Sequence, residues 1–255
     1  MKTALCLSGG GVRGFAHIGA LKAFEEAGLS FDITVGTSAG SLAGALYAAG
    51  VSAREAESYA LCVDLGSVRS GVPFMPSDPY NIGKLVCRLT GDVMIERLPK
   101  KFAAVATDLR SAKLAVLDSG SLLASVSASC AIPFLFRPVV LGEQYLADGG
   151  ILNNVPADVC RMLGAQKVIT VDVHASRGRG AMGTGLFDTL KATFGIMMAN
   201  ASVTGLRLSD VVIAPDTAAY SVKEKEGRAA LIRAGYEATK ARLDEIFEVI
   251  NKSEE

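Results

Sequence analysis

The residues with the clearest chemical signature form the run Gly36-Thr37-Ser38-Ala39-Gly40, which matches the pattern G-x-S-x-G. An apolar run over residues 33–35 precedes it, and Leu42 and Leu46 follow at helical spacing. On a sharp turn between a strand and a helix, this pattern exposes a serine hydroxyl that can attack an acyl group. The sequence therefore predicts that Ser38 is the nucleophile of a serine acyl hydrolase.

A serine nucleophile needs a base, and the candidates are one aspartate and the two histidines of the chain. Asp148 begins the run Asp148-Gly149-Gly150 after a predicted strand, where a glycine turn would hold its carboxylate toward a cleft. His174 also follows a predicted strand, and with Asp148 it gives the chain order Ser-Asp-His of an α/β-hydrolase triad. That plan places several strands before its nucleophile, whereas the sequence predicts one before the Ser38 strand. Asp148 is therefore the favoured base, His174 stays an alternative, and His17 is typical of a packed or capping histidine.

A glycine-rich loop, Gly9-Gly10-Gly11-Val12-Arg13-Gly14, follows the first predicted strand, as the Ser38 run follows the second. N–H groups of Gly9, Gly10 and Gly11 are candidates for an oxyanion hole, and the Ala39 N–H is a further donor. The same loop also satisfies the dinucleotide-binding pattern G-x-G-x-x-G. That kind of site expects an acidic residue about 20 positions further on, at the end of the second strand, where this chain has the Ser38 run. Nucleotide binding therefore stays a disfavoured alternative.

The composition argues against several classes of protein. The 26 basic and 26 acidic side chains balance, so no net charge attracts nucleic acid or holds an anionic membrane. The five cysteines are odd in number and contain no C-x-x-C pair, which fits a reducing, cytoplasmic setting without zinc or redox chemistry. No segment has the pattern of a secretory signal or a membrane span. We expect a soluble cytoplasmic protein with no metal or cofactor, in which any peripheral membrane contact is transient, apolar and local.

Short apolar runs alternate with amphipathic stretches along the chain, a pattern typical of a mostly parallel sheet covered by helices on both faces. We expect a single α/β domain over residues 1–255. Ser52 and Glu55 have the spacing of a capping box at a helix start. The proline-rich residues 66–80 are predicted to be a loop, either a lid over an apolar pocket or a plain surface crossover. The expected strands are residues 3–7, 33–35, 102–107, 114–117, 139–146 in two pieces, 168–173 and 211–214. The expected helices include residues 122–130, 155–163, 186–208 and about 224–250, and residues 178–185 are expected to form a loop.

Taken together, the three motifs make the chain resemble the patatin-like phospholipase family, and its bacterial members in particular. The resemblance depends on the order and spacing of the glycine-rich loop, the Ser38 run and Asp148-Gly149-Gly150 followed by Asn154 and Pro156. Weaker similarities extend it over nearly the whole chain, at Ala106-Thr107-Asp108, residues 127–138 and Gly235-Tyr236.

This resemblance implies a three-layer α/β/α sandwich and a hydrolase that cleaves acyl esters of lipids without a metal. It implies a dyad of Ser38 and Asp148 without a catalytic histidine, and an oxyanion hole in the glycine-rich loop, where Arg13 matches the basic position of the family. His17 matches a frequent but non-catalytic histidine. We therefore expect a lipid or ester substrate, and no sequence feature indicates an oligomeric state. A catalytically silent lipid-binding or regulatory module remains the third alternative, disfavoured by the intact Ser38 and Asp148.

Overall fold

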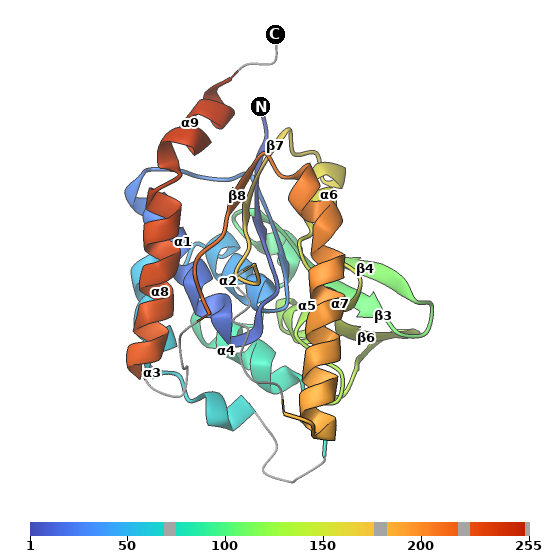
Figure 1. The fold of residues 1–255 in the computed structure, drawn as a ribbon. Helices are drawn as coiled ribbons and strands as arrows, with labels where there is room; N and C mark the ends of the chain where they lie inside the picture. The colour runs from blue at the N-terminus through green and yellow to red at the C-terminus, as the bar shows by residue number, and fades with distance from the viewer. Residues whose placement is uncertain (69–74, 176–182, 219–224, 253–255) are drawn as a thin grey trace.

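A single sheet runs through the computed structural model, which describes residues 1–68, 75–175, 183–218 and 225–252 (Figure 1). Within these residues, eight strands form the sheet in the order β5-β6-β3-β2-β1-β7-β8, and β4 pairs with β3 beside this path. Neighbours from β3 to β8 run parallel, whereas β4 and β6 pair antiparallel with β3, and β5 pairs antiparallel with β6. The strands are β1 (Thr3–Leu7), β2 (Ile33–Thr37), β3 (Lys101–Asp108), β4 (Lys113–Leu117), β5 (Val139–Leu141), β6 (Gln144–Asp148), β7 (Lys167–Val171) and β8 (Val211–Ile213).

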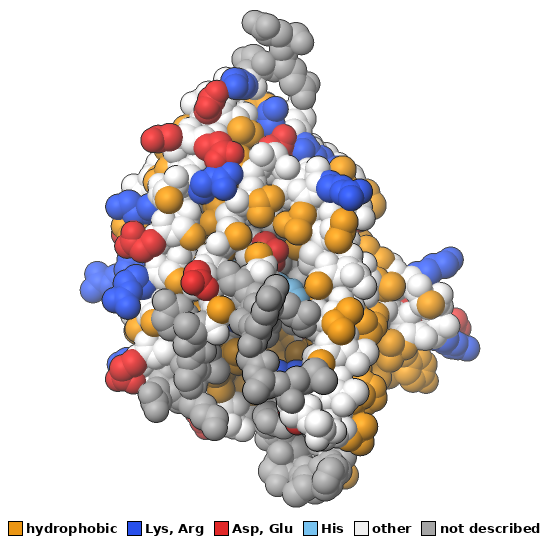
Figure 2. All heavy atoms as spheres, in the orientation of Figure 1, with side chains coloured by type: hydrophobic (Ala, Val, Ile, Leu, Met, Phe, Trp, Pro, Cys, Tyr) orange, Lys and Arg blue, Asp and Glu red, His pale blue; other side chains and the backbone are white. Residues whose placement is uncertain are grey.

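Helices cover both faces of this sheet. In Figure 1, α1, α8 and α9 lie on one side of the strands, and α6 and α7 lie on the other. Figure 2 shows charged side chains gathered over α8 and α9, whereas the surface over α7 is largely hydrophobic. The helices are α1 (Phe15–Glu26), α2 (Ala39–Ala48), α3 (Ala53–Cys62), α4 (Tyr80–Thr90), α5 (Leu122–Ser129), α6 (Ala157–Met162), α7 (Leu186–Leu208), α8 (Lys225–Lys240) and α9 (Leu243–Asn251).

Strand β1 shows why the sheet needs cover on both faces, because all five of its residues are buried. Leu5 and Leu7 point to one face and pack with Phe24 of α1. Ala4 and Cys6 point to the other face, where the α6 residues Val159 and Cys160 lie. Side chains of a strand alternate between faces, so a strand buried on both sides reads as a continuous apolar run. The predicted three-layer α/β/α sandwich is confirmed.

The strand pairing brings the three sequence motifs to one edge of the sheet. Leu7 at the end of β1 pairs with Gly36 of β2 and with Val171 of β7, so the loops that follow these strands emerge together. Strand β3 lies between β2 and β6, where Thr37 pairs with Val105 and Ala106 pairs with Asp148. The ends of β2 and β6 therefore flank consecutive residues of β3.

The predicted C-terminal helix over residues 224–250 is wrong in one respect, because two helices occupy this region. Helix α8 ends at Lys240, and α9 begins at Leu243 after Arg242, whose φ of −114° lies outside the helical range. Helix α8 packs on α1 and α3, whereas α9 packs on β7 and β8, with Ile246 fully buried. The break lets the chain turn from the helical layer onto the strands.

The other predicted elements are confirmed to within a few residues, including the capping box of Ser52 and Glu55 at the start of α3. The predicted loop over residues 66–80 begins in a short 3-10 helix (Leu65–Val68) and ends where α4 begins at Tyr80. Its residues 69–74 and most of the predicted loop 178–185 fall outside the described residues. Within the described part of the chain, no helix is both long and apolar enough to cross a membrane.

Candidate active site

Ser38 sits on a strained turn between β2 and α2. Its φ of 52° and ψ of −122° lie in a region that non-glycine residues rarely adopt, and the residue is the N-cap of α2. The flanking glycines make this turn possible, because a Cβ at Gly36 would clash with the Gly40 carbonyl and one at Gly40 with the Leu7 carbonyl. Strain of this kind collects at functional sites, where the surrounding structure over-determines the backbone.

Ser129, at the end of α5, holds the backbone of this turn. The Ser38 N–H donates to the Ser129 Oγ over 2.8 Å, and the Ser129 hydroxyl donates to the Val105 carbonyl over 2.7 Å. From the other side, the Ser41 hydroxyl donates to the Ser38 carbonyl over 2.7 Å. Sequence reasoning assigned no role to Ser129, because it lies 91 residues from Ser38 and only the fold brings them together.

Asp148 ends β6 and is fully buried beside Ser38. Its Oδ1 accepts the Gly150 N–H over 2.8 Å, whereas its Oδ2 has no hydrogen-bond partner of ordinary geometry among the described residues. Burial raises the pKa of this carboxyl to about 7, against smaller lowering effects from the Ser38 hydroxyl and the Gly150 N–H. The structure thus brings together the two residues that the sequence predicted as nucleophile and base.

Both histidines have other surroundings. His17 is fully buried on α1, its Nε2 donates to the Ser8 carbonyl over 2.9 Å, and burial lowers its pKa to about 4. His174 lies beyond β7, and its N–H donates to Asp172 Oδ1 over 2.9 Å. The pKa of Asp148 is raised by burial and lowered by hydrogen bonds from Ser38 and the Gly150 N–H. These contacts favour the pair of Ser38 and Asp148 over the Ser-Asp-His alternative.

The glycine-rich loop lies directly against the Ser38 turn. A Cβ at Gly9 would come within 3.4 Å of the Ser38 Cβ, and a Cβ at Gly14 would clash with the side chain of Ala39. The Gly9 N–H donates to the Asn154 carbonyl over 3.0 Å. Among the described residues, no hydrogen-bond partner is recorded for the N–H groups of Gly10, Gly11 and Ala39, which leaves these three as available donors.

The remaining loop residues frame these donors. Gly11 has a φ of 57°, and a Cβ there would meet no atom within 4 Å, so this position faces open space. Arg13 lies half-buried in the 3-10 helix Gly11–Gly14, and its N–H donates to the Gly10 carbonyl over 3.3 Å. Asn154 is fully buried behind the loop, with its Nδ2 donating to Ser202 of α7 over 3.0 Å. The asparagine thereby ties α7 to the candidate site.

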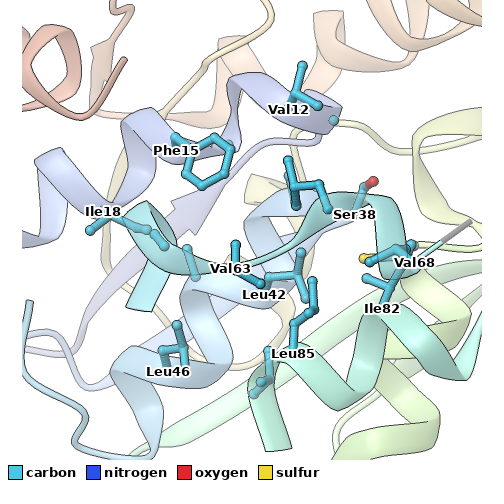
Figure 3. A pocket seen from close by; sticks show the side chains of 18 of the residues that line it. Val12, Phe15, Ile18, Ser38, Leu42, Leu46, Val63, Val68, Ile82 and Leu85 are labelled. Carbon is cyan, nitrogen blue, oxygen red and sulfur yellow. The ribbon is translucent and has the colours of Figure 1, made fainter. Parts of the chain in front are cut away.

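An apolar cavity of about 330 Å³ opens on Ser38 (Figure 3). It follows α2 from Ala39 through Leu42 to Leu46. Residues of the glycine-rich loop, α1, α3 and α4 form further parts of its wall, together with Val63, Leu65, Val68, Cys130 and Ile132. The described residues that line it include no charged side chain. In Figure 3, the Ser38 hydroxyl lies to one side of the gathered apolar side chains, with Leu46 and Ile18 on the far side. Sequence reasoning proposed an apolar pocket only as one interpretation of residues 66–80, and it did not identify the lining, which comes from many separate segments.

Cys130 lines this cavity and interacts with both residues of the dyad. Its Sγ is 3.7 Å from the Ser41 hydroxyl, and burial together with the negative charge of Asp148 raises its pKa. The thiol is therefore neutral at physiological pH, which makes it a poor nucleophile. In the described residues, no group of three or more His, Cys, Asp or Glu side chains is placed to hold a metal ion.

Comparison with known proteins decides the family. The family model described as patatin-like phospholipase matches residues 5–161, more than half of the chain, and this range contains Ser38 and Asp148. The chain belongs to the patatin-like phospholipase family. The resemblance seen in the motifs is thereby confirmed, and family membership supports a lipid hydrolase activity.

Two relatives place the chain within this family. An uncharacterised NTE family protein of Mycobacterium tuberculosis is 33% identical over an aligned length of 267 residues. The alignment covers 94% of this chain and 46% of that protein. The human patatin-like phospholipase domain-containing protein 6 is 37% identical over 188 residues, which cover 67% of this chain and 13% of that protein. The chain thus spans about half the length of the mycobacterial relative and a small part of the human one.

A solved structure shares the patatin-like fold. VipD from Legionella pneumophila superposes with a TM-score of 0.64 over 96% of this chain and 67% of its own. Sequence identity in this comparison is 17%, so the likeness concerns the fold.

Proposed function

We propose that this protein hydrolyses acyl esters of lipids, with Ser38 as the nucleophile and Asp148 as the general base. The observation that carries the proposal is the buried carboxyl group, whose pKa is raised to about 7, beside a serine on a strained turn. An ordinary aspartate, with a pKa of about 3.9, is too weak a base at neutral pH, whereas a base with a pKa near the working pH is efficient. Membership of the patatin-like phospholipase family supports the same activity.

In the first step, the Ser38 hydroxyl oxygen attacks the carbonyl carbon of the ester, while Asp148 Oδ2 accepts the hydroxyl proton. The tetrahedral intermediate collapses, and the leaving alcohol takes this proton from Asp148, which leaves an acyl group on Ser38. In the second step, water attacks this acyl group and gives a proton to Asp148. Collapse of the second intermediate returns that proton to the Ser38 oxygen and releases the fatty acid.

The negative charge of both intermediates needs donors close to Ser38. In this proposal, the N–H groups of Gly10, Gly11 and Ala39 fill this role, because each is without a recorded partner among the described residues. Gly9 would then act as a support, since its N–H is bonded to the Asn154 carbonyl and its missing side chain leaves room beside Ser38. Arg13 would position the loop from its half-buried place in the 3-10 helix.

The cavity supplies a place for the acyl chain. It extends along α2 from Ser38 to Leu46, a distance of about 12 Å at the helical rise of about 1.5 Å per residue. An extended alkyl chain advances about 1.25 Å per carbon, given bonds of about 1.5 Å, so the cavity fits a chain of about ten carbons. An apolar wall binds such a chain by removing its surface from water.

Labelling with a fluorophosphonate probe, together with release of fatty acid from a panel of esters and phospholipids, tests the proposed function. The wild type should be labelled and active, and the Ser38→Ala variant should lose both properties. Ser127→Ala is a matched control, because this buried serine lies on α5 and donates to the Leu123 carbonyl over 2.6 Å. Labelling of the Ser38→Ala protein, or an inactive but correctly folded wild type, would contradict the proposal.

The nucleotide-binding alternative gains no support from the geometry. Strand β2 contains no acidic residue, and the cavity beside the glycine-rich loop is lined by apolar side chains without a charged group among the described residues. A dinucleotide site needs polar partners for its ribose and phosphates. The probe experiment separates the third alternative, because a catalytically silent lipid-binding module would not react with a fluorophosphonate.

A further inference from the structure

Two segments near the cavity are joined by a bridge, and each carries an exposed apolar side chain. Ser77 forms a parallel bridge with Phe136, in which the Ser77 N–H donates to the Leu135 carbonyl over 2.8 Å and the Arg137 N–H donates to the Ser77 carbonyl over 3.0 Å. Met75 and Phe134 each lie two residues before the bridged pair, and they are 56% and 65% exposed. The bridge therefore holds together two segments that each carry an exposed apolar side chain.

The backbone of Phe134 makes its exposure unusual. Its φ of 68° lies in the left-handed region, which a bulky residue adopts only at a cost in free energy. Burial of the ring does not offset this cost, because most of the side chain is open to solvent. A strained conformation that presents an aromatic ring to water indicates a surface that is covered when the protein works.

The segment that carries Phe134 also reaches the cavity that opens on Ser38. Ile132, two residues before Phe134, lines the cavity and packs with Val68, another lining residue. On the glycine-rich loop, Val12 both lines the cavity and is 50% exposed, so it stands at the cavity opening. We call Val12, Met75 and Phe134 the apolar rim.

The chemistry of the cavity identifies what covers the rim. A cavity whose wall has no charged group fits an alkyl chain. Long alkyl chains are held in lipid aggregates and are not dissolved in water. A chain that moves from a bilayer into the cavity avoids water only if the opening touches the bilayer. Because the net charge of the protein is zero, apolar contact rather than charge must provide the attraction.

We infer that the apolar rim inserts into the surface of a phospholipid bilayer and aligns the cavity opening with it. The inference rests on the proposed function for its choice of ligand. Docking itself needs no turnover, so it is measured on the Ser38→Ala protein.

The absence of tryptophan from the sequence allows a direct test. A single tryptophan is introduced by Phe134→Trp or by Met162→Trp, each in the Ser38→Ala background. Met162, in α6, is also 65% exposed but lies at the opposite edge of the sheet. The carbonyl of its neighbour Leu163 accepts a hydrogen bond from Lys101, which begins β3. With phosphatidylcholine vesicles, the tryptophan emission of the Phe134→Trp protein should shift to the blue, and that of the Met162→Trp protein should not.

Binding is then measured by sedimentation with the same vesicles. Replacing Met75 by Ser together with Phe134 by Asn should weaken binding about tenfold or more, because two apolar side chains are then lost from the surface that inserts. Asparagine tolerates the left-handed conformation of residue 134, so the variant should fold. Met162→Ser and Ile196→Asn are controls, since Ile196 is 57% exposed on the apolar surface of α7.

Three outcomes would overturn the inference: unchanged binding of the rim variant, loss of binding in Ile196→Asn instead, or a wild type that forms a dimer or protein complex and ignores vesicles. In the active protein, the rim variant should hydrolyse a dissolved short-chain ester at the wild-type rate and lose activity on vesicles. A wild type that binds vesicles through the rim but hydrolyses no ester would contradict the proposed function and leave the docking surface standing.

Discussion

Two fully buried titratable side chains lie on opposite sides of the Ser38 turn, and burial affects their chemistry in opposite ways. His17 has its pKa lowered to about 4, so at neutral pH it is an uncharged hydrogen-bond donor to the Ser8 carbonyl. Asp148 has its pKa raised to about 7, so at neutral pH both its charged and its protonated forms are populated. The same removal from water fixes one residue in a single protonation state and lets the other exchange a proton.

Access to a reacting group is the second difference. Both side chains have a buried atom without a hydrogen-bond partner among the described residues, Nδ1 of His17 and Oδ2 of Asp148. Only Asp148 interacts with Ser38, which lines the cavity, whereas His17 bonds to the Ser8 carbonyl. Burial alone therefore does not make a catalytic base. The comparison suggests that a buried group becomes a base when its pKa lies near the working pH and a hydroxyl stands beside it.

The largest effect is expected when Asp148, the buried group with the raised pKa, is replaced. Asp148→Asn should lower kcat/KM for an ester by about 10²–10⁴-fold, the usual contribution of a general base, whereas His174→Ala and His17→Gln should stay within a few fold. Wild-type activity should fall as the pH drops below about 7, because protonation of Asp148 removes the base. A pH profile left unchanged by Asp148→Asn would refute the role of this carboxylate, and loss of activity in His174→Ala alone would return the triad to favour.

Stability should respond with a sign opposite to that of activity. The folded pKa of Asp148, about 7, lies above the unfolded value of about 3.8, so the folded state gains a proton that the unfolded state lacks between these values. Stability contributed by the protonated form is present below pH 4 and is lost as the pH rises through 7, by about 4 kcal/mol at 1.36 kcal/mol per unit. Urea unfolding should therefore show Asp148→Asn more stable than the wild type at pH 8.

The same measurement separates the two buried groups. The difference between Asp148→Asn and the wild type should disappear below pH 4, because Asp148 is then protonated in both the folded and the unfolded state and His17 titrates equally in both proteins. The contribution of His17 runs the other way, since its folded pKa of about 4 lies below the model-peptide value of 6.5, so stability falls as the pH drops through this window. A variant that gains nothing at pH 8 would show that the Asp148 carboxylate is better solvated than its burial indicates.

A smaller effect is expected from the support of the nucleophile. Ser129→Ala leaves the buried Ser38 N–H without its acceptor, which costs about 1–3 kcal/mol. If this cost raises the activation free energy because Ser38 is no longer held in place, kcat falls by about 5- to 150-fold. Ser127→Ala, on the same helix, should keep wild-type kcat. A drop in stability with normal kcat would make Ser129 a structural residue and not a positioning one.

The smallest expected effect concerns the cavity that gives access to the dyad. Ala60→Leu adds bulk to the wall contributed by α3, so the preferred acyl chain should become shorter by a few carbons, with a few-fold change in relative kcat/KM across an ester series. Activity on a short-chain ester should remain unchanged, because the part of the wall that Ala60 contributes lies away from Ser38. An unchanged chain-length profile would place the acyl chain elsewhere.

The sequence predicted the elements that local patterns encode. Buried strands such as β1 and β7 are mostly apolar runs, and the Ser52–Glu55 capping box marks the start of α3. The break between α8 and α9 had no such signal, because neither glycine nor proline stands at Ala241 and Arg242. It arises from packing, as each helix follows its own neighbour in the fold.

The candidate site was predictable in its motifs and not in its physical chemistry. Ser38 and Asp148 stand out because glycines flank them at fixed spacing. The raised pKa of Asp148, the tether from Ser129 and the cavity depend on contacts between distant segments, which one sequence does not encode locally. The same holds for the apolar rim, where a bridge joins segments about 60 residues apart that carry Met75 and Phe134.

Strand β3 has a consequence for how activity appears during folding. Ser38 and Asp148 are 110 residues apart in sequence (148 − 38), and β3 must pair with both β2 and β6 before the two side chains meet. Contacts of such long range form late and slowly, after local helices. Recovery of ester hydrolysis on refolding should therefore lag behind recovery of the helical circular dichroism signal, so enzymatic turnover would report the completion of the sheet.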